Sequence, residues 1–255
     1  MLLLFRSVPS PPRIGYREGG CLVRKKLRRK LTGGLALCLC FLGVCALLYP
    51  RETAPAFARM TGSTLVIDPG HGGEDGGAVS VTGVPESGMN LSIALRLDAL
   101  MGFYGVRTLL TRTEDVSIHD GDARTLREKK VSDLHNRAAL INAAENATLI
   151  SIHQNAAPAG EYRGAQVFYA GGADSLALAE NIQTGLRRCL DRENTRAPQV
   201  IPSSVYLMNH IQCRAVLVEC GFVSNRSEEI LLQNADYQKK LAMVLGAGYL
   251  TAGEG

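Results

Sequence analysis

Three apolar segments of the chain each lead to a residue that can bind a metal ion or exchange a proton. These residues are His71, His153 and Glu219. A catalytic zinc site usually has three protein ligands, for example two imidazoles and one carboxylate, and leaves a fourth position open for water. His71 and His153 could supply the two imidazoles. The two histidines come from different segments, so this is not the helical HExxH arrangement. The pattern predicts zinc as the cofactor, with His71 and His153 among its ligands.

A third zinc ligand is expected from an acidic residue near His71. We predict Glu86, which lies in the loop after His71, just before a helical pattern, where its backbone can fold back over the site. Glu74 and Asp75 are nearer in sequence, but glycines surround them. A glycine-rich turn there would point both of these side chains outward.

Glu219 is the predicted catalytic acid–base. Zinc would lower the pKa of bound water from about 15.7 to roughly 7 and would polarise a substrate carbonyl. A carboxylate is then needed to take the water's proton and to pass it to a leaving nitrogen. The alternative for Glu219 is a structural acid paired with a cation. Because burying an unpaired charge at the end of an apolar strand is costly, we favour the functional role.

The elements that must position these residues follow from the alternation of strand and helix patterns, which predicts an α/β domain with a mostly parallel sheet. The carboxyl ends of parallel strands meet at one edge, so the three residues should converge there. We expect strands over residues 64–67, 106–111, 148–153, 164–169 and 215–219, an extended piece over 205–208, and helices over 89–104, 132–144, 173–190 and 235–250, with a short helix after Asn225 or Ser227.

Two helix details are specific enough to test. Ser132 is the predicted N-cap of the second helix. In the first helix, residues at helical spacing are expected on the inner side, namely Ile93, Leu97, Leu100 and Tyr104.

Polar residues near the predicted site could have either a functional or a purely structural role. Asp68 either orients His71 through a hydrogen bond or caps the turn. Asn155 either contacts substrate or closes the turn after its strand. Ser151 lies two residues before a histidine but lacks the GxSxG context of a serine hydrolase. The remaining histidines lie in polar segments and are expected to face solvent: His119, His135 and His210.

Charge is distributed unevenly along the chain. The 255 residues carry a formal net charge of +4. Residues 1–30 hold nine Lys or Arg and one Glu, and residues 31–50 hold none of these, so the rest of the chain carries −4. The basic character belongs to the amino-terminal tail, which argues against nucleic-acid binding by the main domain.

The seven cysteines do not form a disulfide framework, and no pair has CxxC metal spacing. Four of them precede or lie within the apolar run near the amino end. The other three are Cys189, Cys213 and Cys220, which we interpret as free thiols. A disulfide between Cys189 and Cys213, or between Cys213 and Cys220, stays open.

The amino-terminal region combines a basic cluster with an uncharged run of about the length that spans a bilayer. Basic residues before such a run place the amino end in the cytoplasm and the following domain outside. A cleaved signal segment, with a small-x-small site at residues 56–58, is the alternative and would make the protein secreted. The expected organisation is a basic cytoplasmic tail over 1–30, a transmembrane anchor over 31–50, a linker over 51–62 and a catalytic domain over 63–252.

The motifs resemble those of a known enzyme family, the zinc-dependent N-acetylmuramoyl-L-alanine amidases of the "amidase 3" type. The matching segments, in order, are IDPGHGG at 67–73, Glu86 with Asn90-Leu91, Thr111-Arg112, SIHQN at 151–155 and VECGFVSN at 218–225. The resemblance implies zinc on His71, Glu86 and His153, with Glu219 as acid–base, in a twisted sheet flanked by helices. It also implies hydrolysis of the amide between the lactyl group of N-acetylmuramic acid and L-alanine in peptidoglycan.

Some features resemble the sporulation-type members of this family, which act in spore cortex formation. These are a single amino-terminal anchor, a lone catalytic domain without wall-binding repeats, and KKVSDL at 129–134. Cys213 and Arg214 depart from the pattern, since relatives often carry proline before the last strand.

Two other function classes could use parts of this sequence. A phosphate-binding hydrolase built on residues 70–77 would lack the Lys-Ser/Thr that a P-loop requires. A catalytically inactive, membrane-anchored cell-wall-binding module is the main alternative, and the presence of all four metal and catalytic residues argues against it. The expected partners are peptidoglycan and, through residues 31–50, the membrane; no nucleic acid is expected, and a protein activator is left open.

Overall fold

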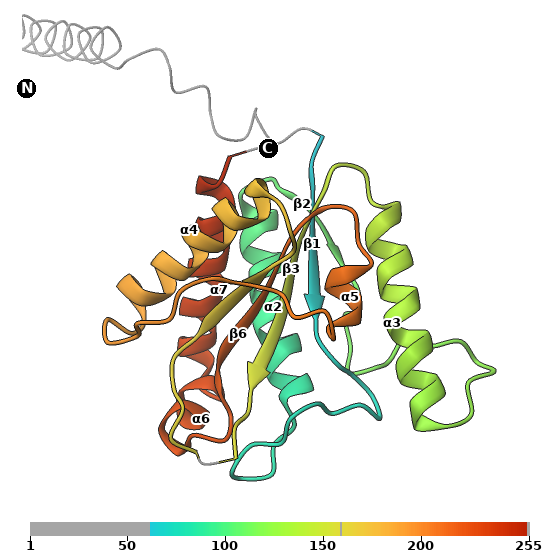
Figure 1. Ribbon diagram of the computed structural model, residues 1–255, viewed down its shortest axis with the longest axis horizontal. Coiled ribbons are helices and arrows are strands. Elements are labelled where there is room, and N and C mark those ends of the chain that lie inside the picture. Colours follow the sequence, from blue (N-terminus) through green and yellow to red (C-terminus); the bar gives the residue numbers. More distant parts are fainter. Residues whose placement is uncertain (1–61, 159, 254–255) are drawn as a thin grey trace, which may run out of the picture. The chain divides into compact units, whose positions relative to one another are not determined.

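The computed structural model describes residues 62–158 and 160–253, which form a sheet with helices on both faces (Figure 1). The elements, in chain order, are β1 (Thr64–Pro69), α2 (Glu86–Phe103), β2 (Arg107–Leu110), α3 (Leu126–Ala143), β3 (Ala147–Asn155), β4 (Gln166–Tyr169), α4 (Ala173–Cys189), β5 (Gln199–Val200), α5 (Tyr206–Asn209), β6 (Arg214–Phe222), α6 (Arg226–Leu232) and α7 (Ala235–Thr251).

The sheet is mixed: most neighbouring strands pair in parallel, as predicted, and one pair is antiparallel. Its strand order is β2-β1-β3-β6-β4-β5. Strand β1 pairs in parallel with β2 and β3, and β3 pairs in parallel with β6. Strand β4 runs antiparallel to β6, and β5 runs parallel to β4. Only a loop joins β3 to β4, and a parallel return would need a longer crossover, so β4 runs back in the opposite direction.

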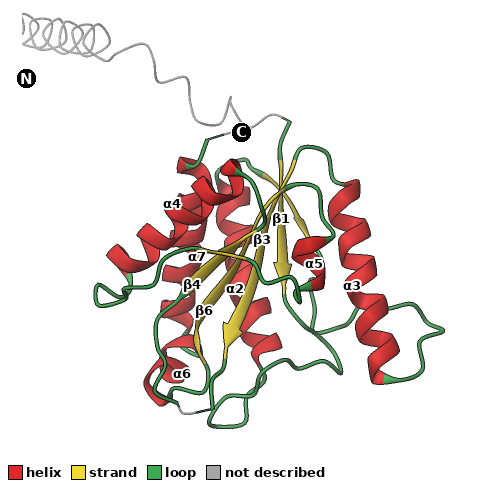
Figure 2. Cartoon of the chain, in the orientation of Figure 1, coloured by secondary structure: helices red, strands yellow, loops and turns green. Residues whose placement is uncertain are grey.

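Both faces of the sheet are buried, which explains why its central strands are continuously apolar. In β1, Leu65 and Ile67 belong to the core under α2, α4 and α7, whereas Val66 belongs to the core under α3 and α5. Figures 1 and 2 show these helices on the two sides of the sheet. The predicted α/β domain, with a sheet flanked by helices, is confirmed.

Three local predictions were wrong. Helix α3 begins at Leu126, with Thr125 as its N-cap and Glu128 closing a capping box, so Ser132 is an interior residue. Its hydroxyl instead donates to Asp120 Oδ2 at 2.7 Å. The piece over residues 205–208 is not extended, because most of it forms α5. Tyr104 lies just after the last turn of α2 and is 40% exposed, and the buried residue is Met101.

The strand registers bring the predicted chemistry together at one edge. His153 lies opposite Glu219, and Asp68 lies opposite Ser151. Alternate residues of a strand share a face, and Leu217, two before Glu219, packs in the core under α3 and α5. These four side chains therefore share the α3 side of the sheet. The predicted convergence of strand ends is confirmed.

The predicted amino-terminal anchor, residues 31–50, lies outside the described residues. Within 62–158 and 160–253, no helix is both long and apolar enough to cross a membrane. Cys189, Cys213 and Cys220 are all free thiols, so neither of the two disulfides left open by the sequence is formed.

Candidate metal centre

Three side chains from different parts of the chain meet at the carboxyl edge of the sheet. Glu86 Oε1 lies 2.5 Å from His71 Nε2 and 3.5 Å from His153 Nδ1. One donor atom from each residue lies within 4.8 Å of the others. Glu86 is buried and both histidines are partly exposed. The residues predicted as metal ligands are thus brought together, with their donor atoms facing one another.

The loop after β1 folds back so that Glu86 can reach this edge. The Glu86 amide donates to the Ala78 carbonyl at 2.8 Å, and Val79 forms an isolated bridge with Pro85. Gly77 has φ +71°, and a Cβ there would overlap the Glu86 carboxylate. A side chain at Gly70 would likewise overlap the His153 ring. Two of the glycines in the loop are therefore required by the close approach of the candidate ligands Glu86 and His153.

Asp75 fixes the orientation of His71. Its Oδ2 lies 2.9 Å from His71 Nδ1, which leaves Nε2 facing Glu86. The prediction that Asp75 points outward was wrong, because Asp75 turns back onto His71 and also pairs with Lys130 at 3.1 Å. Glu74 does point outward, and Lys129 Nζ lies 2.5 Å from it. A carboxylate behind a ligating histidine sets its tautomer and raises its basicity.

The electrostatics of the cluster favour a cation between these residues. Burial would lower the pKa of His71, but hydrogen bonds and charge attraction from Asp75 and Glu86 outweigh it and raise this pKa to about 9. The hydrogen bond from His71 lowers the pKa of Asp75. Burial would raise the pKa of Glu86, yet the two histidines lower it.

Asp68 makes no bond to His71, and it does not merely cap the turn. It is buried, and it accepts hydrogen bonds from Arg137 Nη1 at 2.7 Å, Thr111 Oγ1 at 2.6 Å and Ser151 Oγ at 2.7 Å. Burial would raise the pKa of Asp68, but the Arg137 guanidinium and the two hydroxyls lower it to about 2. The first alternative, direct orientation of His71, was wrong.

Arg137 and Arg112 shape the backbone that presents His71. His71 has φ +61°, a left-handed conformation that is uncommon outside glycine. Arg137 Nη2 donates to the His71 carbonyl at 2.8 Å, and Arg112 Nη2 donates to the Gly70 carbonyl at 3.1 Å. Asp68 therefore acts on His71 through Arg137. Sequence reasoning gave Arg137 no role, because an arginine within a helical pattern carries no signal of burial.

Glu219 stands beside the three donors without a polar partner of its own. Its Oε2 is buried and accepts no hydrogen bond from any described residue. Burial raises the pKa of Glu219 to about 7, with His153 lowering it and the Glu86 charge raising it. The alternative in which Glu219 is a structural acid paired with a cation has no counterpart among the described ion pairs.

The other polar candidates lie outside the cluster. Asn155 closes the end of β3, since its carbonyl accepts from the Val223 amide at 2.8 Å. His135 and His210 are exposed, as expected; His210 stacks on Tyr206, and the His135 ring lies tilted against it. His119 is half-buried and bonds Ser117.

The donor set fits a divalent metal ion of the zinc type. Two imidazole nitrogens and one carboxylate oxygen converge, while the buried Oε2 of Glu219 nearby is left without a partner. Three protein ligands with an open position are typical of catalytic rather than structural zinc sites. The residues present can therefore hold such an ion.

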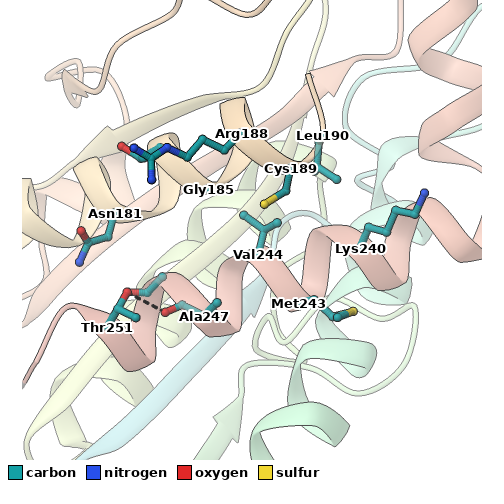
Figure 3. Close-up of a pocket in the computed structure, with 12 residues that line it drawn as sticks. Asn181, Gly185, Arg188, Cys189, Leu190, Lys240, Met243, Val244, Ala247 and Thr251 are labelled. Atoms are coloured by element: carbon teal, nitrogen blue, oxygen red, sulfur yellow. Dashed lines mark hydrogen bonds between the residues drawn. The ribbon is translucent and has the colours of Figure 1, made fainter. Parts of the chain in front are cut away.

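A groove elsewhere on the molecule lacks the residues needed to bind a metal ion. A groove of about 490 Å³ runs between α4 and α7, and Figure 3 shows Cys189 and Val244 pointing toward one another across it. Its walls are mostly apolar, and its charged lining residues are Arg188 and Lys240. It includes neither an acid nor a histidine, so we place the active site at the carboxyl edge of the sheet.

Comparison with known families decides the class of enzyme. A family model described as N-acetylmuramoyl-L-alanine amidase (Amidase_3) matches residues 65–248. The chain belongs to this family. The match spans β1 through most of α7 and includes every candidate site residue. The resemblance seen in the motifs is confirmed, and with it the assignment to the amidases.

Individual relatives agree with this assignment. The germination-specific N-acetylmuramoyl-L-alanine amidase of Bacillus subtilis is 36% identical over 192 residues, covering 75% of this chain and 80% of the relative. Among solved structures, the CwlD amidase of Clostridioides difficile, in complex with the GerS lipoprotein, is 35% identical with a TM-score of 0.71; the match covers 74% of this chain and 97% of that one. An N-acetylmuramoyl-L-alanine amidase from Clostridium difficile 630 is 30% identical with a TM-score of 0.61, covering 74% and 96%.

Proposed function

We propose that this amidase uses zinc, held by His71, Glu86 and His153, to hydrolyse the amide between N-acetylmuramic acid and L-alanine, with Glu219 as the catalytic acid–base. The observation that supports this best is the convergence of three donor atoms within 4.8 Å of one another beside a buried carboxylate oxygen without a partner. When bound, zinc supplies a Lewis acid that makes water acidic near neutral pH and polarises the scissile carbonyl.

The protein's own groups then have separate tasks. Glu219 takes a proton from the attacking water as the new C–O bond forms at the lactyl carbonyl. The same carboxyl returns that proton to the alanine nitrogen as the C–N bond breaks, so the products are a lactyl carboxylic acid and a free amine. Asp75 holds the His71 ring by its Nδ1. Arg137 and Arg112 hold the turn that carries this ring.

The biological setting is proposed from relatives and from the amino-terminal pattern. Similarity to the germination-specific amidase supports a role in spore cortex maturation. A relative solved with a lipoprotein supports a protein partner for this chain as well. The basic cluster before residues 31–50 supports a cell-membrane anchor with the catalytic domain, residues 63–252, outside the cytoplasm.

The zinc ligands are tested by metal content. His71→Ala and His153→Ala in the full chain should abolish stoichiometric zinc, measured by elemental analysis, because each removes a ligand from a three-ligand site. Glu86→Ala should weaken zinc strongly in a competition titration. Glu74→Ala is the matched control, since that side chain points outward to Lys129 and should leave zinc unchanged. Full zinc occupancy in both histidine variants would remove the assignment.

Activity is tested by mass spectrometry of purified peptidoglycan incubated with the full chain and zinc. The expected products are stem peptides with a free amino-terminal alanine and glycan strands with uncapped lactyl groups. A protein that binds peptidoglycan but releases no peptide would instead support the inactive wall-binding alternative. Topology is tested with a carboxyl-terminal reporter that works only outside the cytoplasm; activity of a strictly cytoplasmic reporter would contradict the anchor.

A further inference from the structure

Arg196 lies near Glu219, on the side of this residue away from His153. In the sheet, β6 separates β3 from β4, so Glu219 has His153 opposite it on one side and Gln166 on the other. Directly opposite residues share a face, with Cβ atoms about 4.5–5.5 Å apart. Gln166 is buried, and its Oε1 accepts a hydrogen bond from Arg196 Nη1 at 2.9 Å. Arg196 is therefore one side chain removed from the catalytic glutamate.

Contacts with the surrounding loop and with an aromatic ring hold the Arg196 side chain in this position. Its Nε donates to the Arg163 carbonyl at 3.0 Å, and its guanidinium carbon lies 4.9 Å from the centre of the Phe222 ring. Its amide donates to Asn194 Oδ1 at 2.9 Å, and Asn194 is itself buried and donates to the Ala165 carbonyl, just before β4. A guanidinium fixed on an aromatic face and by two acceptors loses little further freedom when it binds a ligand.

The charge of Arg196 is uncompensated within the described part of the chain. Two buried or sheet-edge acids have arginine partners, Asp68 in Arg137 and Glu229 in Arg226. Arg196 forms no ion pair with a described acid, and its hydrogen bonds go only to a side-chain amide and a carbonyl. Arg196 as a whole is half-buried. A fixed guanidinium of this kind fits a carboxylate.

We propose that Arg196 binds a carboxylate of the stem peptide and so selects acidic over amidated peptides. The assignment rests on the proposed function and adds a specificity position to it. In uncut peptidoglycan the lactyl groups are tied up as amides and the sugars are N-acetylated, so the free carboxylates lie on the stem peptides. In this proposal a substrate bound across His153 and Glu219 extends its peptide side toward Gln166, within reach of Arg196.

The test compares two muropeptides that differ only at the acidic residue of the stem, one with a free α-carboxylate and one with a carboxamide. Hydrogen bonds to charged groups contribute about 1.5–3 kcal/mol, so Arg196→Gln should raise KM for the acidic muropeptide about 10- to 100-fold. Values of kcat and zinc content should stay unchanged. KM for the amidated muropeptide should change less than about 2-fold. Arg196→Lys, which keeps the charge but not the fork, should fall between wild type and Arg196→Gln.

Arg192→Gln is the matched control, because it removes an exposed arginine from the same loop and should leave both substrates unaffected. Equal effects of Arg196→Gln on the two muropeptides, or no effect on either, would overturn the assignment while leaving the amidase function intact. Inhibition of wild type, but not of Arg196→Gln, by free N-acetylmuramic acid would move the carboxylate to the sugar side and also overturn it. Failure of wild type to cleave either muropeptide would remove the proposed function and this assignment together.

Discussion

Asp68 and Glu219 have almost the same sequence context and opposite surroundings. Each carboxylate follows an apolar run, at or near the carboxyl end of a central parallel strand, and both lie on the same face of the sheet. Asp68 accepts hydrogen bonds from a guanidinium and two hydroxyls, and its pKa is held at about 2. Glu219 has a buried oxygen with no described partner, and its pKa is raised to about 7.

The difference shows that a strand-end acid is made structural or reactive by what reaches it from elsewhere. Arg137 comes from α3, sixty-nine positions along the chain from Asp68. Within residues 62–158 and 160–253, no arginine or lysine forms an ion pair with Glu219, and its buried Oε2 accepts no hydrogen bond. A carboxylate with its lone pairs filled cannot accept a proton near neutral pH, whereas one with a free oxygen and a raised pKa can. The contrast yields the following predictions.

The largest effect is expected at Glu219. Glu219→Gln should keep the fold and the zinc, since the amide fills the same volume, but should lower kcat by about 10²–10⁴-fold, which a general acid–base typically contributes. Zinc content, melting temperature and muropeptide release are measured on one preparation. Near-normal release from a zinc-loaded variant would put Glu219 in the same structural class as Asp68.

Removing the partner of Asp68 should instead cost stability. Arg137→Leu leaves a buried carboxylate without its cation, and breaking a buried pair in this way typically costs about 3–5 kcal/mol. The free energy of unfolding is measured in urea. Arg127→Leu, an exposed arginine of the same helix, is the control and should change it by less than about 0.5 kcal/mol. A loss below about 1 kcal/mol for Arg137→Leu would contradict the structural role of the pair.

Asp75 is expected to affect metal binding rather than the chemical step or the stability of the fold, because its carboxylate contacts His71. Asp75→Ala should weaken zinc affinity by about 10- to 100-fold, the usual cost of removing a carboxylate behind a ligating histidine. Zinc competition against a chelator measures this. The fold should stay intact, as judged by circular dichroism. An unchanged zinc affinity would mean that the contact between Asp75 and His71 does not bear on the metal.

At acidic pH, the free energy of unfolding should fall because Asp68 becomes protonated. The folded pKa of Asp68, about 2, lies below its ordinary value of 3.8. Its contribution is thus fully present above about pH 3.8 and is lost as the pH falls through 2. A shift of this size corresponds to about 2 kcal/mol of unfolding free energy. Urea unfolding between pH 5 and pH 2 measures the loss, and Asp68→Asn should lack this part of the pH dependence.

The convergence of His71, His153 and Glu219 was predictable because the signals are local. An apolar strand that leads to a histidine or a glutamate is visible in a single segment, and parallel pairing then fixes where the segment ends meet. Helix boundaries with strong patterns were also predictable, as for α4 and α7. The start of α3 was missed because the capping box at Thr125 and Glu128 lies in a stretch rich in charge, where no apolar period marks the first turns.

The supporting contacts were not predictable, since they join distant segments. Asp75 was expected to point outward, but glycines permit several turn conformations. In the conformation adopted, the Asp75 carboxylate makes a hydrogen bond with His71. The antiparallel β4 was missed because an apolar run does not state its direction. Gln166 lies opposite Glu219 only through strand pairing, and Arg196 reaches Gln166 only through the return of a loop.

Both ends of the described chain lie at the sheet edge opposite the metal centre. The Gly62 carbonyl accepts from Asn146 at 3.0 Å, just before β3 begins, and the Gly253 carbonyl accepts from Arg214 at 2.7 Å, where β6 begins. A surface or particle coupled at either end would therefore hold the domain from behind. Immobilised enzyme would present the candidate metal residues outward to an insoluble substrate.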